Sequence, residues 1–226
     1  MKIEKLNWDT NFFEFKIGKF IINDENDFHP LEFKKQAIDE NYGLVYVFKF
    51  FEKLSWQKVI NAKLEMVDIM LTMSKKFDKI KYKATTYDFR TELSNNELNE
   101  CYDIAEHIAT VSRFYNETKI GKEKTKTLYK KWIDNALKNI FSDGLIIVKE
   151  NDKVVGINLI KTDDKNQIGH CSVIGVNPHH KIKGVGTKLW EKAYGYWANE
   201  KDIDYCFVPF SFQNIESFNF HLKMGF

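Results

Sequence analysis

Two glycines near the end of the chain stand where a predicted strand passes into a predicted helix. The segment 176–189 reads Val-Asn-Pro-His-His-Lys-Ile-Lys-Gly-Val-Gly-Thr-Lys-Leu. Glycine permits backbone angles and a close ligand approach that other residues do not. The unpaired N–H groups of a helix's first turn, together with its dipole, attract anions. The segment therefore predicts a phosphate-binding loop, to which Lys181 and Lys183 add positive charge.

Two well-known phosphate loops do not match this segment. A dinucleotide-binding loop needs a third glycine and an early strand, and a Walker loop needs Gly-Lys-Ser/Thr after four spacer residues. Gly184 and Gly186 have neither context. Two interpretations remain: a phosphate loop of another kind, and a tight turn that only opens a surface helix.

A second group of polar side chains lies on the predicted last helix, residues 214–224. Spacings of three and seven residues place Asn214, Ser217 and His221 on one helix face. An apolar stripe beside them consists of Ile215, Phe218 and Leu222. The group has structural interpretations as well, because asparagine is a common helix N-cap and His221 could be an ordinary surface histidine.

The elements that must position these residues follow a regular order in the last eighty residues. Hydrophobic periodicity predicts three strands, a helix, a strand and a helix, at 145–148, 154–160, 168–176, 184–199, 205–208 and 214–224. A helix that connects two strands is the signature of a βαβ crossover, so the strands at 168–176 and 205–208 should be parallel.

The earlier part of the chain predicts a small separate domain. Residues 31–38 have a helical pattern, and residues 43–48 and 66–73 read as strands. The pattern of apolar and polar residues changes near residue 87. Ser94 and Glu97 then form a capping box before a helix, and a second helix spans about 125–140. We expect a small amino-terminal α/β domain at 1–86 and a second domain at 87–226.

Composition excludes several classes of protein. The 34 basic and 32 acidic side chains leave a net charge of +2, without the basic excess of a nucleic-acid-binding protein. No apolar run is long enough to span a membrane, and no signal peptide is visible, so the cytoplasm is the expected location. Cys101, Cys171 and Cys206 are widely separated, which predicts buried thiols and no metal site. The sequence is compatible with a homodimer.

The loop and the last helix together resemble the GNAT acetyltransferases. Their cofactor motif is Gln/Arg-x-x-Gly-x-Gly/Ala, with Lys181 here in the first position, and Asn214, Ser217, Gly225 and Phe226 match their closing motif. The resemblance implies a mixed α/β GNAT fold and acetyl-CoA as co-substrate, with no metal. The implied cofactor-binding residues are Val173, Ile174, Gly175, Val176, Lys181, Ile182, Lys183, Gly184, Val185, Gly186, Thr187 and Asn214.

This chain departs from the family pattern in two places. His221 stands where the family usually has the tyrosine that protonates the leaving thiolate. Imidazole titrates near neutral pH and can donate a proton, so His221 is the predicted catalytic acid. In the family a further strand follows Gly-Phe, whereas this sequence stops at Phe226. We expect the terminal strand to be truncated, dispensable or supplied by another chain.

A narrower resemblance is to the bacterial TDP-fucosamine acetyltransferases, which acetylate nucleotide-linked amino-deoxy sugars. The similar segments are 6–13, which reads Leu-Asn-Trp-Asp-Thr-Asn-Phe-Phe, the triplet Ser-Arg-Phe at 112–114, and the helix around Trp132. The resemblance implies a TDP-amino sugar as acceptor, in surface-polysaccharide biosynthesis, with Arg113 and Tyr115 as substrate-binding residues. The aromatic residues of 6–13 are also explained by core packing alone.

Several functional alternatives stay open on the sequence. The acceptor could be another amine, such as a peptide amino terminus, a polyamine or an aminoglycoside, or the chain could bind CoA without catalysis. Direct attack by the amine is expected. Its base is His170 or, more simply, a chain of water molecules, and no base is readable that would make Cys171 a nucleophile.

Overall fold

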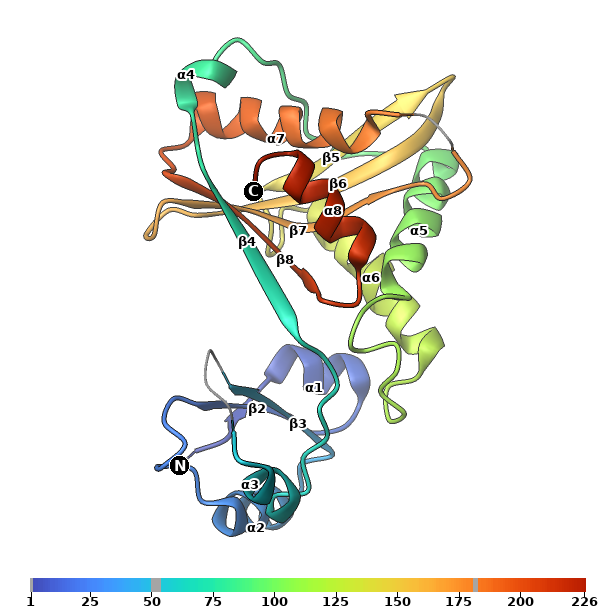
Figure 1. Cartoon of the computed structure of the whole chain (residues 1–226). Coiled ribbons are helices and arrows are strands. Elements are labelled where there is room, and N and C mark those ends of the chain that lie inside the picture. The colour runs from blue at the N-terminus through green and yellow to red at the C-terminus, as the bar shows by residue number, and fades with distance from the viewer. Residues whose placement is uncertain (1, 50–53, 181–182) are drawn as a thin grey trace. The chain divides into compact units, whose positions relative to one another are not determined.

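The structure, a computed structural model, describes residues 2–49, 54–180 and 183–226. The chain forms two compact units, Met1–Val67 and Asp68–Phe226. Each unit contains one sheet with helices packed on it (Figure 1). The mixed α/β class expected from the sequence is therefore confirmed, with a small amino-terminal sheet and a larger sheet of five strands.

The amino-terminal unit is built around a three-stranded sheet. Its elements in chain order are β1 (Glu4–Lys5), α1 (Asn7–Phe13), β2 (Ile17–Ile22), α2 (Pro30–Asp39), β3 (Leu44–Lys49) and α3 (Trp56–Asn61). Strand β2 is antiparallel to β1 and parallel to β3. Within the motif at 6–13, Phe13 is buried, while Trp8 is half-buried and stacks on Phe12 with ring centroids 5.1 Å apart. The side chains of Trp8 and Phe12 thus pack against each other on α1.

The carboxy-terminal unit holds the predicted phosphate loop and a sheet in the order β4-β8-β7-β6-β5. Its elements are β4 (Met70–Lys76), α4 (Lys79–Tyr82), α5 (Asn95–Ala109), α6 (Lys122–Leu137), β5 (Gly144–Glu150), β6 (Lys153–Asp163), β7 (Ile168–Val176), α7 (Val185–Glu200), β8 (Tyr205–Ser211) and α8 (Ile215–Lys223). Strands β7 and β8, joined by α7, are parallel as expected, and their other neighbours are antiparallel.

Helices cover both faces of this sheet (Figure 1). Helix α7 lies on one face, where glycines let it approach: a Cβ added at Gly169 would come within 2.5 Å of the Trp197 ring. Helix α5 lies on the other face, where a Cβ added at Gly175 would come within 2.4 Å of the Ile108 side chain. The capping box of Ser94 and Glu97 that starts α5 is present as predicted.

The boundary between the units differs from the expected one at residue 86. Strand β4 pairs with β8 along its whole length, from Met70 opposite Ser211 to Lys76 opposite Tyr205. Phe77, which follows β4, is part of the carboxy-terminal core. The segment 68–86 therefore belongs to the second unit, and it borders the side of β8 that faces away from β7. From the sequence we expected the final strand to be truncated, dispensable or supplied by another chain. We did not expect that a strand from earlier in the same chain would border β8.

Truncation tests this role of β4. A chain of residues 68–226 keeps β4 and should unfold cooperatively on heating, whereas a chain of residues 87–226 exposes an unpaired strand edge and loses Phe77 from the core. Loss of one buried phenylalanine typically costs about 3 kcal/mol. We expect the shorter chain to aggregate or to melt at a much lower temperature, as measured by circular dichroism and size-exclusion chromatography. Equal melting of the two chains would contradict the role assigned to β4.

Candidate functional site

The site begins where two parallel strands separate. Strands β7 and β8 pair from Ile168 opposite Tyr205 to His170 opposite Phe207, and no later pair joins them among residues 168–176 and 205–211. Both strands nevertheless continue, to Val176 and Ser211. Each keeps its other neighbour, β6 or β4. Beyond His170, the backbone groups of β7 and β8 that face each other are not paired together. They are therefore available to a ligand, because buried backbone N–H groups need hydrogen-bond partners.

A bulge in β7 lies just beyond the last β7–β8 pair. Leu159 pairs with Val173 and Ile160 with Cys171, so Ser172 is the extra residue. The bulge reverses which side chains face α7: Cys171 does so before it and Ile174 after it. Bulges bend a strand and increase its local twist. This one therefore supports the separation of β7 from β8.

The predicted phosphate loop leads into α7 as expected. Gly184 is the N-cap of α7 and has a positive φ of 87°, and a Cβ added there would meet no atom of the described residues within 4 Å. No side chain of the described residues caps this helix, so the first-turn N–H groups are left for another acceptor. An anion such as a pyrophosphate fits this arrangement. Lys183 is exposed beside it, and Lys181 and Ile182 lie outside the described residues.

Gly186 lies in a close contact between two helices that the sequence did not predict. A Cβ at this position would lie 2.9 Å from the Phe220 ring of α8. The absence of a side chain at Gly186 therefore lets α8 pack closely against the start of α7. Close approach of a ligand to Gly186 stays a prediction.

Asn214 caps the last helix. Its side-chain oxygen accepts a hydrogen bond from the N–H of Ser217 at 3.0 Å. The expected common face is present too, since Ser217 Oγ lies 3.2 Å from Nδ1 of His221. The capping interpretation of Asn214 is thus observed, and a cofactor contact by the same side chain stays a prediction.

His221 is buried, with 1% of its surface exposed, and both ring nitrogens are hydrogen-bonded. The Trp190 indole N–H donates to Nε2 at 3.1 Å. Because indole N–H can only donate, Nδ1 carries the proton and donates to the Ser217 carbonyl at 2.8 Å. Burial lowers the pKa of His221, and the Ser217 hydrogen bond opposes that shift. The enclosure of this imidazole favours a packing role for His221 over the role of catalytic acid expected from the sequence, and the activity of a His221 variant tests this corrected role.

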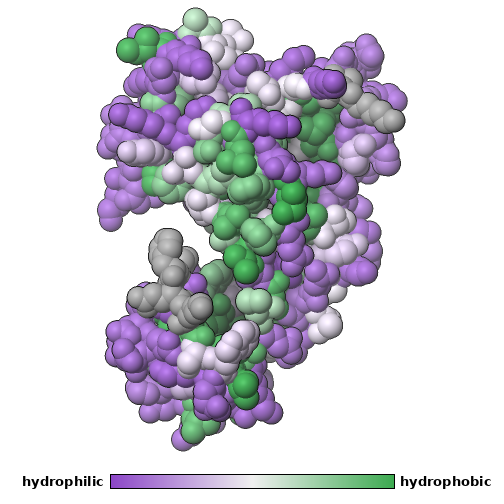
Figure 2. Space-filling view, viewed as in Figure 1, coloured by the Kyte–Doolittle hydropathy of each residue, from purple (hydrophilic) through white to green (hydrophobic). Residues whose placement is uncertain are grey.

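The outer face of α8 is apolar instead. Ile215 is 53% exposed and Leu222 is 48% exposed, so the stripe identified in the sequence points partly to solvent while His221 points to the core. Figure 2 shows hydrophobic residues gathered on the surface over α8 and the adjoining strands. The helix is therefore oriented by its contacts with Trp190 and Phe226 rather than by its hydrophobic stripe.

A polar cluster lies near the end of β8. Asp68 accepts a hydrogen bond from Ser211 Oγ at 2.6 Å. Burial raises the pKa of Tyr129, Ser112 and the charge of Arg113 oppose that shift, and the charge of Asp68 adds to it. The predicted residue Arg113 and Asp68 therefore act on the same phenol with opposite charges. Sequence reasoning missed Asp68, which is 143 residues from Ser211 and carries no local signal.

Tyr115 contacts the start of α6 and its own turn. The Nζ atom of Lys122 is 5.4 Å from the centroid of the Tyr115 ring, and the backbone N–H of Tyr115 donates to the Ser112 carbonyl at 3.1 Å. A role for Tyr115 in substrate binding stays a prediction.

The two remaining titratable candidates lie on β7. His170 is at the last pair with β8, its ring 5.7 Å from that of Phe207, and burial lowers its pKa. A neutral histidine can accept a proton, so the role of base stays a prediction. Burial raises the pKa of the Cys171 thiol, which keeps it protonated and unsuited to nucleophilic attack.

Comparisons with known proteins point to one family. The profile of the acetyltransferase (GNAT) family matches residues 100–226. A conserved protein of unknown function from Staphylococcus epidermidis is 14% identical, covering 93% of this chain and 79% of its own, with a TM-score of 0.56. PH1933 from Pyrococcus horikoshii is 20% identical over 69% of this chain and 88% of its own, with a TM-score of 0.45.

A third solved structure is the PaiA N-acetyltransferase from Thermoplasma acidophilum in complex with coenzyme A. It is 16% identical, covering 68% of this chain and 87% of its own, with a TM-score of 0.45. A search of curated proteins returned no match. In the described residues no helix is long and apolar enough to cross a membrane, and no group of three His, Cys, Asp or Glu side chains could hold a metal.

Substitution of the two loop glycines separates ligand binding from packing. Gly184→Ala forces a non-glycine residue to positive φ, at a cost of about 1–2 kcal/mol, and should weaken acetyl-CoA binding about tenfold in calorimetry. Gly186→Ala should lower the melting temperature, because the new Cβ meets the Phe220 ring. The double variant Gly186→Ala, Phe220→Leu should recover the melting temperature, because the smaller side chain makes room for that Cβ. Unchanged acetyl-CoA affinity in folded Gly184→Ala would refute the loop's role.

The buried imidazole predicts a pH dependence of stability. Because the folded-state pKa of His221 lies below its value of about 6.5 in the unfolded chain, the free energy of unfolding should decrease as the pH falls through that value. His221→Phe should remove this dependence and cost about 1–3 kcal/mol, since the Trp190 N–H loses its acceptor. Denaturant titrations at several pH values measure both effects, with the exposed His107→Gln as control.

The same variant tests the corrected role of His221 in catalysis. The kcat of folded His221→Phe should change by much less than the roughly 10²-fold loss that follows removal of a general acid. A loss of that size in a variant with parental acetyl-CoA affinity would restore His221 as the catalytic acid.

Proposed function

Because this chain belongs to the acetyltransferase (GNAT) family, and is thus an acetyl-CoA-dependent acetyltransferase, we propose that its acceptor is the amino group of a nucleotide-linked amino-deoxy sugar. The acceptor class is supported by the sequence motifs at 6–13 and 112–114. It is also consistent with the cationic side chain of Arg113, whose charge acts on the same phenol as that of Asp68, the partner of Ser211 at the end of β8. The observation that carries acetyl transfer is the separation of β7 and β8 beside the uncapped start of α7.

The cofactor lies along β7 and the start of α7 in this proposal. The backbone of Val173–Gly175 binds the pantetheine arm and polarises the thioester carbonyl, since these residues follow the bulge and lie beyond the last pair with β8. Residues 184–187 hold the pyrophosphate through the first-turn N–H groups of α7. Asn214, which follows β8 and caps α8, contacts the arm from the side of β8.

The chemistry is direct attack by the acceptor amine. Its nitrogen lone pair forms a C–N bond with the thioester carbon as the C–S bond breaks, and the amine loses one proton while the thiolate gains one. His170 lies where the two strands begin to separate, and its lowered pKa favours the neutral form that can accept the amine proton. The leaving thiol has a pKa of about 8.5, so the thiolate departs with a proton from water rather than from the enclosed His221.

The acceptor's phosphates bind at Arg113 in this proposal. Arginine pairs with phosphate through parallel charge-assisted hydrogen bonds. Asp68, also in this cluster, can attract the acceptor's ammonium group before it is deprotonated. The cluster thus offers one charge of each sign to a nucleotide-linked amino sugar.

A thiol-release assay with a TDP-4-amino-4,6-dideoxyhexose tests the proposal, against a peptide amino terminus, a polyamine and an aminoglycoside. Arg113→Ala should raise the KM for the sugar nucleotide about tenfold, because a charge-assisted hydrogen bond is worth about 1.5–3 kcal/mol. Acetyl-CoA affinity should be unchanged, and the exposed Lys131→Ala should match the parent. Faster turnover of any other amine would reject the sugar acceptor, and equal damage to both substrates would make Arg113 structural.

A further inference from the structure

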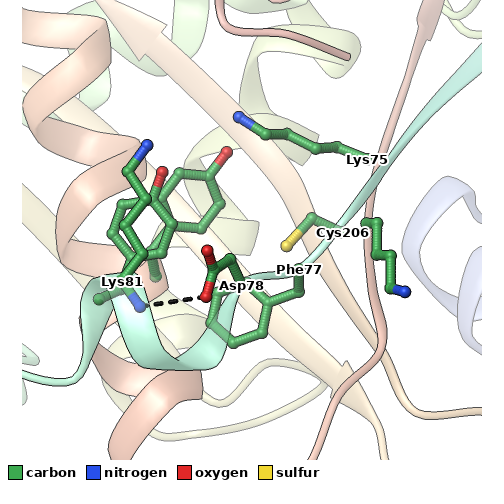
Figure 3. A pocket seen from close by; sticks show the side chains of 8 residues that line it. Lys75, Phe77, Asp78, Lys81 and Cys206 are labelled. Carbon is green, nitrogen blue, oxygen red and sulfur yellow. Dashed lines mark hydrogen bonds between the residues drawn. The ribbon is translucent and has the colours of Figure 1, made fainter.

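A cavity of about 120 Å³ lies in the carboxy-terminal unit, away from the loop before α7. It lies between β4, α4, α7 and the start of β8 (Figure 3), and its lining residues are Lys75, Lys76, Phe77, Asp78, Lys81, Tyr82, Tyr194 and Cys206. Tyr194 is ten residues along α7 from Gly184, a separation of roughly 15 Å at the rise of an α-helix. The cavity is therefore distinct from the proposed acetyl-CoA site.

The charges around this cavity favour an anion. Three lysines and one aspartate line it, and the carboxylate of Asp78 is already hydrogen-bonded to the backbone N–H of Lys81 at 3.1 Å. Lys75 donates one hydrogen bond, to the Met224 carbonyl at 2.6 Å. An ammonium group has three donors. Burial and the neighbouring Lys81 lower the pKa of Lys75, and a bound anion would offset both effects.

The hydroxyl of Tyr194 adds a buried hydrogen-bond donor to the cavity lining. Its side chain is 1% exposed, and its hydroxyl has no hydrogen-bond partner among the described residues. A buried hydroxyl without a partner costs about 1–3 kcal/mol. The ring lies 4.5 Å from that of Tyr82 and 6.0 Å from that of Phe77, measured between centroids. The cavity lining thus combines the unsatisfied Tyr194 hydroxyl with the surfaces of aromatic rings.

We propose that this cavity binds a small monocarboxylate with an apolar body. The carboxylate pairs with the ammonium groups of Lys75 and Lys81, whose side chains extend toward the same side of the cavity in Figure 3, and accepts a hydrogen bond from Tyr194. The body packs against the aromatic rings. The cavity, at about 120 Å³, is smaller than the cavity of about 150 Å³ that binds benzene, so the apolar body can be no larger than one aromatic ring. An inorganic anion would leave the apolar surface without a partner.

Benzoate is the probe, with acetate and inorganic phosphate at equal ionic strength as comparisons. Calorimetry and thermal melting of the full chain should show saturable benzoate binding, weaker acetate binding and none for phosphate. Tyr194→Phe removes one hydroxyl and keeps the ring, so it should raise the stability of the free protein and weaken benzoate binding about fivefold to tenfold. Lys75→Met should weaken it at least tenfold.

Tyr196→Phe is the matched control, because this tyrosine is on the same helix and its hydroxyl donates to Asp143 at 3.2 Å, outside the cavity lining. It should leave the benzoate affinity unchanged. If Lys75→Met does not fold, the Tyr194 and Tyr196 variants still decide. Absence of benzoate binding at tens of millimolar, equal affinity in Tyr194→Phe, or tighter binding of phosphate would each overturn the proposal. None of these outcomes depends on acetyl transfer, so the two proposals fail separately.

Discussion

The short pairing between β7 and β8 is the constraint on which the rest of the carboxy-terminal unit depends. Two parallel strands that paired fully would satisfy each other's backbone and leave nothing for a ligand. Here the pairing ends at His170 and Phe207, and the outer neighbours β6 and β4 hold each strand in place beyond that point. The bulge at Ser172 and the uncapped start of α7 lie just beyond the separation. In the proposed arrangement, the reactive part of the CoA thioester meets fixed backbone groups, which need no rearrangement during the reaction.

The contact between α7 and α8 involves Gly186 and His221, the two motif residues whose surroundings the sequence predicted least well. Gly186 leaves room for Phe220, and the indole N–H of Trp190 donates to His221. These contacts set the position of α8 and hence of its cap, Asn214, beside the end of β8. His221 is thus held by packing and hydrogen bonds, and in the proposed mechanism the thiolate leaves without a buried acid because its conjugate thiol is moderately acidic.

Strand β4 connects features that are otherwise far apart in the sequence. It covers the edge of β8, so that strand is not exposed to pairing with other chains. The residues before it bring Asp68 to Ser211 at the end where the strands separate, and Lys75 and Phe77, at its other end, line the cavity beside Tyr194. Strand β4 and the residues next to it therefore contribute both to the polar cluster at the end of β8 and to the cavity beside Tyr194.

The sequence by itself determined the elements and motifs whose interactions are local. The capping box of Ser94 and Glu97 and the glycine that begins α7 both depend on residues a few positions apart. Only the tertiary structure decided which strand borders β8, that His221 is enclosed, and that Asp68 meets Ser211. These features depend on contacts between segments separated by 31 to 143 residues, such as Trp190 with His221 and Asp68 with Ser211. A periodic pattern shows that a helix has a buried face, but the neighbouring elements decide which side chains that face presents to the core.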